Sequence, residues 1–309
     1  MRLFVAVTDN DWFRFLRSLP DVDEVNFWLP SGGSNFKALD PGEPLLFKLH
    51  SPENYIAGGG FFVRFLSFPW SFVWEAFDQK NGAATQEQMR RRIEKYRRSP
   101  IGPNDTIGCI ILRAPFFFDE SLWIPPPDFA LNIVKGKGYD TKTPAGQQLW
   151  DEVSLRLQGM AAPAAVAAAE APMVEAPMYR DPVLVRSRLG QGTFRVLVTD
   201  NYQRRCAVTG EKALPVLDAA HIRPVAAGGQ HRQDNGLLLR TDVHRLYDKG
   251  YVTVTPDGRF LVSRRLKDDF DNGEPYMPFN DKRIWMPGDP LSQPNREALE
   301  WHADTVFLR

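Results

Sequence analysis

An alanine- and proline-rich segment, residues 159–182, divides this chain into two halves. Its sequence, GMAAPAAVAAAEAPMVEAPMYRDP, holds four prolines and no aromatic residue before Tyr179. Repeated prolines prevent a long helix, and small side chains cannot bury enough apolar surface to fold alone. The segment therefore predicts a semi-extended tether between two domains, residues 1–158 and 183–309, each long enough to form its own core.

Composition narrows the class of protein. Hydrophobic residues make up 43% and charged residues 25% of the 309 residues, which is typical of a globular protein. The net charge is zero, so nucleic-acid binding has to be argued from local features. The two cysteines, Cys109 and Cys206, exclude a disulfide framework and a four-cysteine zinc site.

The first residues, MRLFVAVTDNDWFRFL, do not look like a signal peptide, because Asp9 and Asp11 interrupt a short apolar run. No stretch reaches the roughly 20 apolar residues that are needed to span a bilayer. We therefore expect a soluble cytoplasmic protein without a membrane partner.

The first half alternates short apolar runs with glycine and proline turns, which is typical of strands. The runs LFVAVT, PLLFKL, IAGGGFFVRFLSF and TIGCIILRAPFFF predict a curved β-sheet or barrel with a few helices. One helix is expected over 85–98, where Thr85 and Gln88 form a capping box. Its basic residues Arg90 and Arg91 either follow DNA phosphates or belong to a solvated face.

The second half mixes helices and strands, so the whole chain is expected to be α+β. Apolar spacing predicts a helix around 194–198, and strands are expected at VLDAAHI and GLLL. The segment TDVHRLYDKG predicts a helix closed by Gly250, and YVTVTPDGRFLVS predicts a hairpin with Asp257 and Gly258 at its turn.

Three of the five histidines, His221, His231 and His244, lie within one short stretch of this half. Hydrolysis of a phosphodiester needs a base that activates water and a cation that stabilises developing negative charge. A histidine at a strand end and a second one on the following helix would supply both functions. His231, in the polar loop between them, is interpreted as a residue without a role.

Two further side chains fit this arrangement. Asp248 follows His244 by four residues, so both project from one helical face, as two ligands of one ion should. Asn235 lies between the two histidines, where its amide could hydrogen-bond the loop backbone and hold His221 in place.

The motifs CAVTG, AAHIRP, NGLLL and HRLYDKG, in this order, resemble the HNH endonuclease family of ββα-metal nucleases. The resemblance covers about residues 186–255. It implies that His221 is the general base, Asn235 the middle residue of the family motif, and His244 a ligand of one divalent metal ion, Mg²⁺ or Mn²⁺.

One position departs from the family pattern. Many members carry an acidic metal ligand immediately before the first histidine, whereas this chain has Ala220 there. Asp218 could replace it if the strand twists or bulges, and Asp248 is the other candidate. Three nearby arginines, either solvated or bound to phosphates, are Arg223, Arg240 and Arg245.

The first half resembles the PUA superfamily, the EVE, ASCH, YTH and SRA group of modified-base readers. The resemblance rests on the pair Phe27 and Trp28, on the PGE…LLFKL strand and on the glycine-rich strand IAGGGFFV. It implies a compact β-barrel that holds one flipped base, at a cost of a few kcal/mol that stacking and hydrogen bonds offset. Candidate pocket residues, each of which could instead be core, are Trp28, Phe36, Trp70, Trp74, Asn26, Ser31 and Asp78.

Together these features predict a modification-dependent restriction endonuclease. Its first domain would read 5-methyl- or 5-hydroxymethylcytosine in double-stranded DNA, and its HNH domain would cut nearby. Because one nuclease site cuts one strand, a homodimer is expected for double-strand cleavage. The alternatives are an HNH nuclease triggered by a phosphorothioate, a ligand or RNA, and a non-catalytic nucleic-acid-binding protein.

Overall fold

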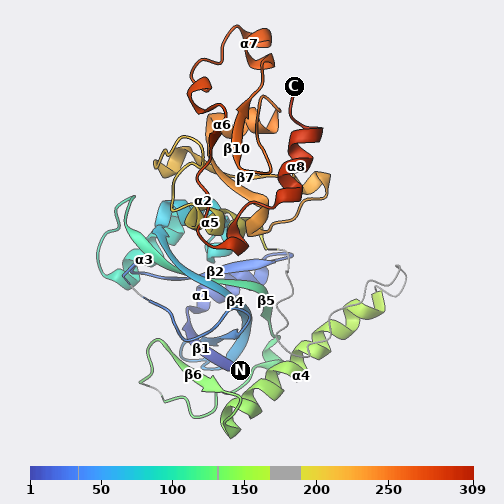
Figure 1. Ribbon diagram of the computed structural model, residues 1–309. Coiled ribbons are helices and arrows are strands. Elements are labelled where there is room, and N and C mark those ends of the chain that lie inside the picture. Colours follow the sequence, from blue (N-terminus) through green and yellow to red (C-terminus); the bar gives the residue numbers. More distant parts are fainter. Residues whose placement is uncertain (34, 131, 168–188) are drawn as a thin grey trace. The chain divides into compact units, whose positions relative to one another are not determined.

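The computed structural model describes residues 1–33, 35–130, 132–167 and 189–309 (Figure 1). The chain forms two compact units, Met1–Val185 and Arg186–Arg309. None of the helices in the described part of the chain is long and apolar enough to cross a membrane.

The first unit is built on a six-stranded mixed sheet with the order β2-β5-β4-β3-β1-β6. Strands β1 and β3 are parallel, and the other neighbours are antiparallel. The helices and strands of this unit are β1 (Arg2–Thr8), α1 (Asn10–Ser18), β2 (Glu24–Leu29), β3 (Pro44–Leu49), β4 (Ile56–Pro69), α2 (Trp70–Phe77), the short turn η1 (Asp78–Asn81), α3 (Gln86–Arg97), β5 (Thr106–Phe117), β6 (Gly136–Asp140) and α4 (Pro144–Ala167).

The sheet is curved but open, so the expectation of a barrel is wrong. Strands β2 and β6 lie at its two edges and do not pair with each other within the described residues. The curvature arises where the register shifts, between Phe47 and Lys48 of β3 and at two places in β4. Such bulges bend a strand locally. A pattern of short apolar runs predicts strands, but it carries no information on whether the edges meet.

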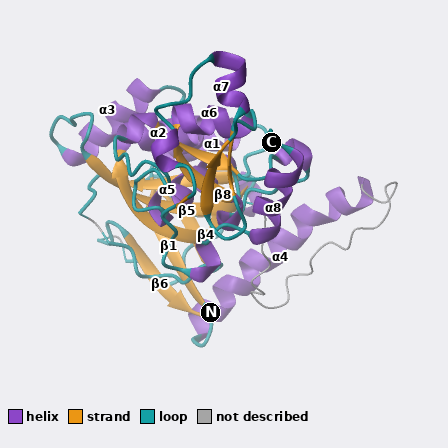
Figure 2. Ribbon diagram, turned by 45° about the horizontal axis from the view of Figure 1, so that its top comes forward, coloured by secondary structure: helices purple, strands orange, loops and turns teal. Residues whose placement is uncertain are grey.

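Both faces of the sheet are buried, which explains the continuous apolar run in β3. Leu45 and Phe47 belong to one core, together with Phe13 of α1. Leu46 points to the opposite face and joins a second core, together with Leu149 of α4. Figure 2 shows strands β1, β4, β5 and β6 of this sheet in orange and helices α1 to α4 of the same unit in purple. Strands covered on both faces lose the polar and apolar alternation of half-exposed strands.

The glycines of β4 are explained by close strand pairing. A Cβ atom on Gly58 would lie 2.3 Å from the carbonyl oxygen of Phe116, and one on Gly59 would lie 2.7 Å from that of Leu45. Side chains at these positions would push the neighbouring strands away.

The observed bounds of helices α3 and α4 can be compared with those expected from the sequence. Helix α3 begins as predicted, with the Thr85 side chain accepting a hydrogen bond of 3.2 Å from the Gln88 amide. Helix α4 continues to Ala167, so the extended tether expected from Gly159 onward is wrong in its first part. Alanine favours helix strongly, which sustains the helix into this segment. The rest of the expected linker, residues 168–182, lies outside the described residues.

The second unit contains an antiparallel pair, β7 and β8, and a three-stranded sheet of order β11-β10-β9. Its helices and strands are α5 (Gln191–Asn201), β7 (Leu217–His221), β8 (Gly236–Arg240), α6 (Thr241–Asp248), β9 (Val252–Val254), β10 (Arg259–Val262), α7 (Arg265–Phe270), β11 (Lys282–Arg283) and α8 (Arg296–Thr305).

The order β7, β8, α6 makes a compact β-β-α substructure, as the sequence predicts. Helix α6 starts directly after β8 and ends at Asp248, two residues before Gly250 with its φ of +76°. Val243 and Tyr247 on its buried face join one core with Leu238 of β8. The predicted hairpin is also present between β9 and β10, with Gly258 at a φ of +81°.

Candidate functional site

His221 is the last residue of β7, and its ring is held from two sides. It stacks on Phe194 of α5, with ring centroids 4.0 Å apart and ring planes 11° apart. Its Nε2 atom lies 2.9 Å from Nδ1 of His231, which is a hydrogen bond between two imidazoles. No partner is predicted for His231 from the sequence, and the structure places its ring against His221.

The surroundings of His221 keep its ring neutral. Burial, and then the charges of His231 and His244, lower the pKa of His221 to about 4. A neutral imidazole at pH 7 has a lone pair that can accept a proton, as a general base must.

Asn235 fixes the loop that connects β7 to β8. Its Nδ2 donates hydrogen bonds of 2.9 Å to the carbonyl oxygens of Arg223 and Gln230, and its Oδ1 accepts one of 3.0 Å from the Arg223 amide. The Asn235 carbonyl also accepts a bond of 3.0 Å from the amide of Ile222, next to His221. The side chain is only 6% exposed. Asn235 thus closes the loop across its base.

His244 of α6 lies between two carboxylates. Its Nδ1 is 3.2 Å from Oδ2 of Asp218, and its Nε2 is 3.4 Å from Oδ2 of Asp248. A twist or bulge of the strand was the condition for Asp218 to reach this position, and Asp218 reaches it while β7 pairs with β8 in unbroken register. Residues two apart on a strand share a face, so Asp218 projects on the same side as Ala220.

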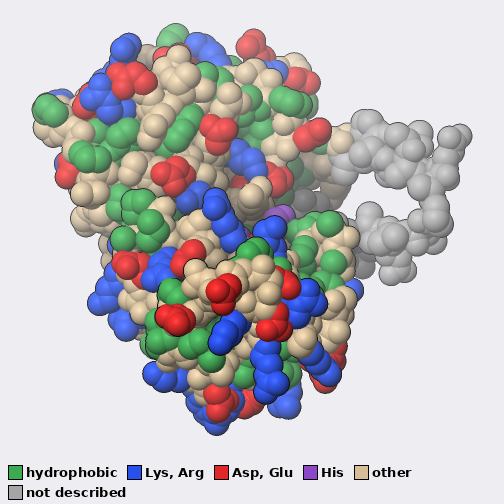
Figure 3. All heavy atoms as spheres, turned by 90° about the horizontal axis from the view of Figure 1, so that it is seen from above, with side chains coloured by type: hydrophobic (Ala, Val, Ile, Leu, Met, Phe, Trp, Pro, Cys, Tyr) green, Lys and Arg blue, Asp and Glu red, His purple; other side chains and the backbone are tan. Residues whose placement is uncertain are grey.

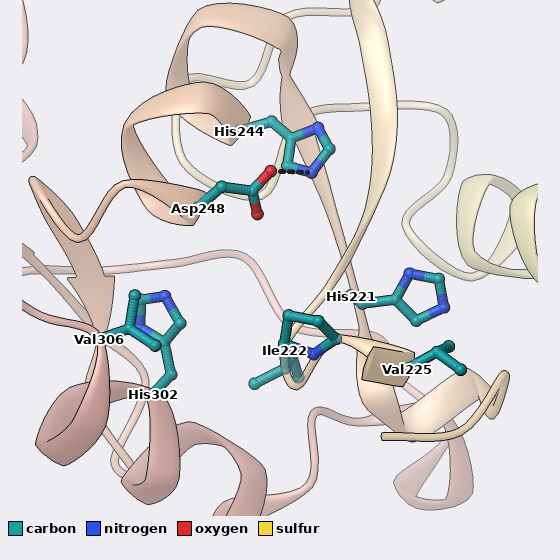
Figure 4. Close-up of a pocket in the computed structure, with 8 residues that line it drawn as sticks. His221, Ile222, Val225, His244, Asp248, His302 and Val306 are labelled. Atoms are coloured by element: carbon teal, nitrogen blue, oxygen red, sulfur yellow. Dashed lines mark ion pairs between the residues drawn. The ribbon is translucent and has the colours of Figure 1, made fainter. Parts of the chain in front are cut away.

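A cavity of about 360 Å³ joins these groups. Figure 4 shows His244 and Asp248 on one side of it and His221 on the other. The complete lining is His221, Ile222, Pro224, Val225, His244, Asp248, His302 and Val306. Asp218 contacts His244 from outside this lining.

The donors around His244 are suited to a divalent cation. The pKa of Asp248 is raised. The main cause is burial of the carboxyl group; the negative charge of Asp218 adds to it, and the neighbouring His244 opposes it. Two carboxylates provide the oxygen ligands that Mg²⁺ and Mn²⁺ prefer, and the imidazole beside them adds one nitrogen ligand. Within the described residues, no group of three or more His, Cys, Asp or Glu side chains is already arranged around a common metal position.

His302 lines the same cavity, but its contacts are structural. Its Nε2 donates 3.0 Å to the carbonyl oxygen of Tyr247, its Nδ1 lies 2.9 Å from the Thr253 hydroxyl, and its ring stacks on the Tyr247 ring. Both nitrogens are used, so His302 has no atom left for a substrate.

The three arginines of this unit differ in their contacts. Arg223 donates 2.7 Å to the Ala227 carbonyl and lies over the Trp301 ring, and Arg240 pairs with both carboxylate oxygens of Asp242. Arg245 is exposed and has no ion pair with a described residue. Basic and acidic side chains are interspersed on the face shown in Figure 3.

In the first unit, Asn81 of η1 brings three of the expected pocket residues together. Its carbonyl accepts 3.0 Å from the Trp28 indole, its Oδ1 accepts 2.9 Å from Asn26, and its Nδ2 donates 2.9 Å to the Asp78 carbonyl. The Asn26 side chain is fully buried, whereas Trp28 is half-buried and Asp78 is exposed.

Three of the other expected pocket residues lie elsewhere, whereas Trp74 adjoins this group through its carbonyl, which accepts a hydrogen bond from the Asp78 amide. Trp70 is 7% exposed and donates to the Gly102 carbonyl, and Phe36 packs on Phe4 and Phe62. Ser31 is exposed in the turn after β2, and Trp74 is half-buried on α2.

Two basic residues of helix α3 pair with the two acidic residues of the same helix. Arg90 pairs with Glu87 and Glu94, and Arg91 pairs with Glu87. Ion pairs of this kind compete with phosphate for the guanidinium groups.

Sequence reasoning missed His231, Phe194 and Asn81. One signal in the sequence pointed to His231. It lies ten residues after His221 in the loop between two strands that were expected to pair, so the two histidines could come close together. The contacts of Phe194 and Asn81 depend on packing between distant segments, so the local sequence carries no sign of them.

Comparisons with known proteins give one family match and distant structural likenesses. No curated protein matches the chain. Among solved structures, an ASCH protein from Zymomonas mobilis, which the first half resembles, has 8% identity and a TM-score of 0.34 over 48% of this chain and 94% of its own. The modification-dependent TagI restriction endonuclease has 13% identity and a TM-score of 0.29 over 99% of this chain and 83% of its own. Residues 206–255 match the sequence model of the HNH endonuclease family, and this part of the chain is therefore an HNH endonuclease domain.

Proposed function

We propose that this protein is a DNA endonuclease whose HNH domain hydrolyses phosphodiester bonds when the first unit binds a modified cytosine. The nuclease part is supported by one observation above all. A half-buried, neutral His221 lines one cavity with the pair His244 and Asp248, and all three lie within the matched residues 206–255. A base for water and a cation site are the two elements that the reaction requires.

In the proposed reaction, His221 accepts a proton from the attacking water as the water oxygen bonds to phosphorus. Asn235 holds the loop that follows His221, so the ring keeps its place on Phe194. A divalent ion held by His244 and a carboxylate, once bound, would stabilise negative charge on the phosphate and on the leaving oxygen.

The two carboxylates beside His244 have different proposed roles. One imidazole ligates a metal through one nitrogen, and the other nitrogen commonly donates to a carboxylate. Asp248 faces the cavity together with His244, whereas Asp218 does not line it. We therefore assign Asp248 as the second ligand and Asp218 as the acceptor of the Nδ1 proton.

This assignment is tested by titrating Mn²⁺ into the Asp248→Asn and Asp218→Asn variants. Asp248→Asn should weaken Mn²⁺ binding at least ~10-fold. Asp218→Asn should have the smaller effect, because its amide oxygen still accepts the proton. The reverse order of effects would contradict the assignment.

The modified-base part of the proposal is supported by the resemblance of residues 25–63 to modified-base readers and by the existence of a separate first unit. Trp28 and Asp78, which meet at Asn81, are the proposed rim of the base site. The half-buried Trp28 ring offers stacking that a flipped base needs.

The test is cleavage of one duplex prepared unmodified, with 5-methylcytosine and with 5-hydroxymethylcytosine, in the presence of Mg²⁺ or Mn²⁺. Cutting of modified duplex only, abolished by His221→Ala, is the expected result. Equal cutting of all three would contradict the reader and leave the nuclease. No cutting by the wild-type protein with either metal would contradict the nuclease itself.

Two further proposals concern the DNA and the assembly. Arg245, exposed beside His244 and without an ion pair among the described residues, is the proposed phosphate contact, ahead of Arg240 with its bound Asp242. Two copies of the chain would place two nuclease sites on one duplex. Cleavage of both strands that occurs only at protein concentrations at which the chain forms dimers would support this.

A further inference from the structure

The contact between His221 and His231 is a directed hydrogen bond between two ring nitrogens, in addition to ring packing. The two rings approach edge to face, with centroids 4.9 Å apart and ring planes 65° apart, so that Nε2 of His221 faces Nδ1 of His231 at 2.9 Å. Phe194 supports both rings, stacked under His221 and tilted against His231 at 5.8 Å.

The backbone holds His231 in this position from both sides. Its carbonyl accepts a hydrogen bond of 3.1 Å from the amide of Leu189. The preceding carbonyl, that of Gln230, accepts one of 2.9 Å from Asn235. The backbone of His231 is thus anchored on both sides, which keeps its ring within reach of His221.

Two neutral imidazoles can share this bond in only two ways. If His231 donates, His221 accepts at Nε2 and carries its own proton on Nδ1, so neither nitrogen of His221 has a lone pair left for water. If His221 donates through Nε2, its Nδ1 is free to accept a proton. Nδ1 of His221 forms no hydrogen bond with any residue that the structure describes. Only the second arrangement makes His221 a base.

We infer that His231 is a positioning residue that fixes the tautomer and orientation of the base His221. This inference rests on the proposed nuclease function. When water attacks, its proton moves to Nδ1 of His221, its oxygen bonds to phosphorus, and the bond to the leaving oxygen breaks. His221 keeps its Nε2 proton and its bond to Nδ1 of His231 throughout, so no proton passes to His231.

Three substitutions at one position separate this role from a structural one. In His231→Asn, the amide oxygen takes the place of Nδ1, which preserves a neutral acceptor. In His231→Asp, a carboxylate oxygen takes the same place and adds a negative charge. His231→Leu fills the space but removes the acceptor. Circular dichroism of each variant checks that the chain is folded.

The assay is plasmid nicking with Mn²⁺ by the full chain, measured as kcat and KM across a pH series. His231→Leu should lower kcat ~10- to 100-fold with little change in KM, the usual effect of losing a group that orients a histidine. His231→Asn should restore most of the lost rate. His231→Asp should move the acidic limb of the profile to higher pH, because the negative charge of a carboxylate beside Nε2 favours the protonated ring of His221.

The inference is overturned if all three variants keep the wild-type rate and profile, or if asparagine is no better than leucine. A second readout does not depend on cutting. Ring ¹⁵N chemical shifts of the wild-type protein at pH 7 should show His221 protonated at Nε2, and His231→Leu should lose this preference. A wild-type protein that cuts nothing would refute the proposed function, while these shifts would still decide the role of His231.

Discussion

The Asn235→Ala substitution removes all three side-chain hydrogen bonds that close the loop after β7. Each such bond contributes about 1 kcal/mol, so opening of the loop should become easier by about 3 kcal/mol. The side chain is only 6% exposed, which leaves the backbone groups of Arg223 poorly hydrated after the substitution. Because about 1.4 kcal/mol corresponds to a tenfold change, exchange of the loop amides should accelerate about 100-fold.

The assay is hydrogen exchange of peptides covering residues 222–235, with plasmid nicking measured on the same samples. Asn280→Ala is the matched control, because the Asn280 side chain accepts a single bond of 2.9 Å from the Val262 amide. The control should leave the 222–235 loop and the nicking rate unchanged. If Asn235→Ala exchanged at the wild-type rate, the loop would be held by something else. Loss of nicking without faster exchange would equally refute the reasoning.

Three other predictions follow from single contacts. Burial lowers the pKa of His302 to about 4, below its unfolded value near 6.5, so its neutral ring contributes stability that is present above pH 6.5 and lost as pH falls toward 4. The free energy of unfolding should fall by about 3 kcal/mol between pH 7 and pH 4 because of this ring. His302→Gln should remove this part of the pH dependence, measured by urea unfolding at both pH values. A variant with the same pH dependence as wild type would contradict the prediction. Gly229→Ala should destabilise the second unit by about 1–3 kcal/mol, because its Cβ would lie 1.9 Å from the Arg223 carbonyl oxygen, while Gly288→Ala, with nothing within 4 Å, should melt as wild type. Arg245→Ala should reduce the salt dependence of DNA binding by about one phosphate contact, measured by fluorescence anisotropy against salt, and an unchanged slope would exclude the contact.

The local structure of the second unit could be predicted because each element carries its own signal. The helix that contains His244 has an apolar face and a glycine with positive φ two residues after its end. The chain between the strands returns within 14 residues, so His221 and Asn235 had to lie close together. The hydrogen bonds of Asn235 to the loop backbone are those that an amide in this place can make.

Features that depend on the path of a loop or on distant packing could not be predicted in this way. The pairing of His231 with His221 depends on how the polar loop folds back, which its glycines and polar residues leave undetermined. Asp218 was a candidate from the sequence, but its approach to His244 depends on the strand face that it shares with residue 220. Both contacts depend on orientation, which follows from geometry rather than from residue type.

In the first unit, too, local features could be predicted from the sequence and long-range features could not. The strands of the sheet follow from apolar runs between turns, but the open edges at β2 and β6 depend on long-range pairing. The aromatic residues could not be sorted into core and pocket, because Trp28 and Trp70 look alike in sequence. Only the structure distinguishes a half-buried Trp28 from a nearly buried Trp70.

The most direct test of the nuclease is nicking of supercoiled plasmid by the full chain, first stripped of metal and then supplied with Mn²⁺. The wild-type protein should convert plasmid carrying 5-methylcytosine or 5-hydroxymethylcytosine to the nicked form only when Mn²⁺ is present, and His221→Ala and His244→Ala should not. A wild-type protein that leaves these plasmids intact, or a His221→Ala protein that nicks as fast as wild type, would contradict the account.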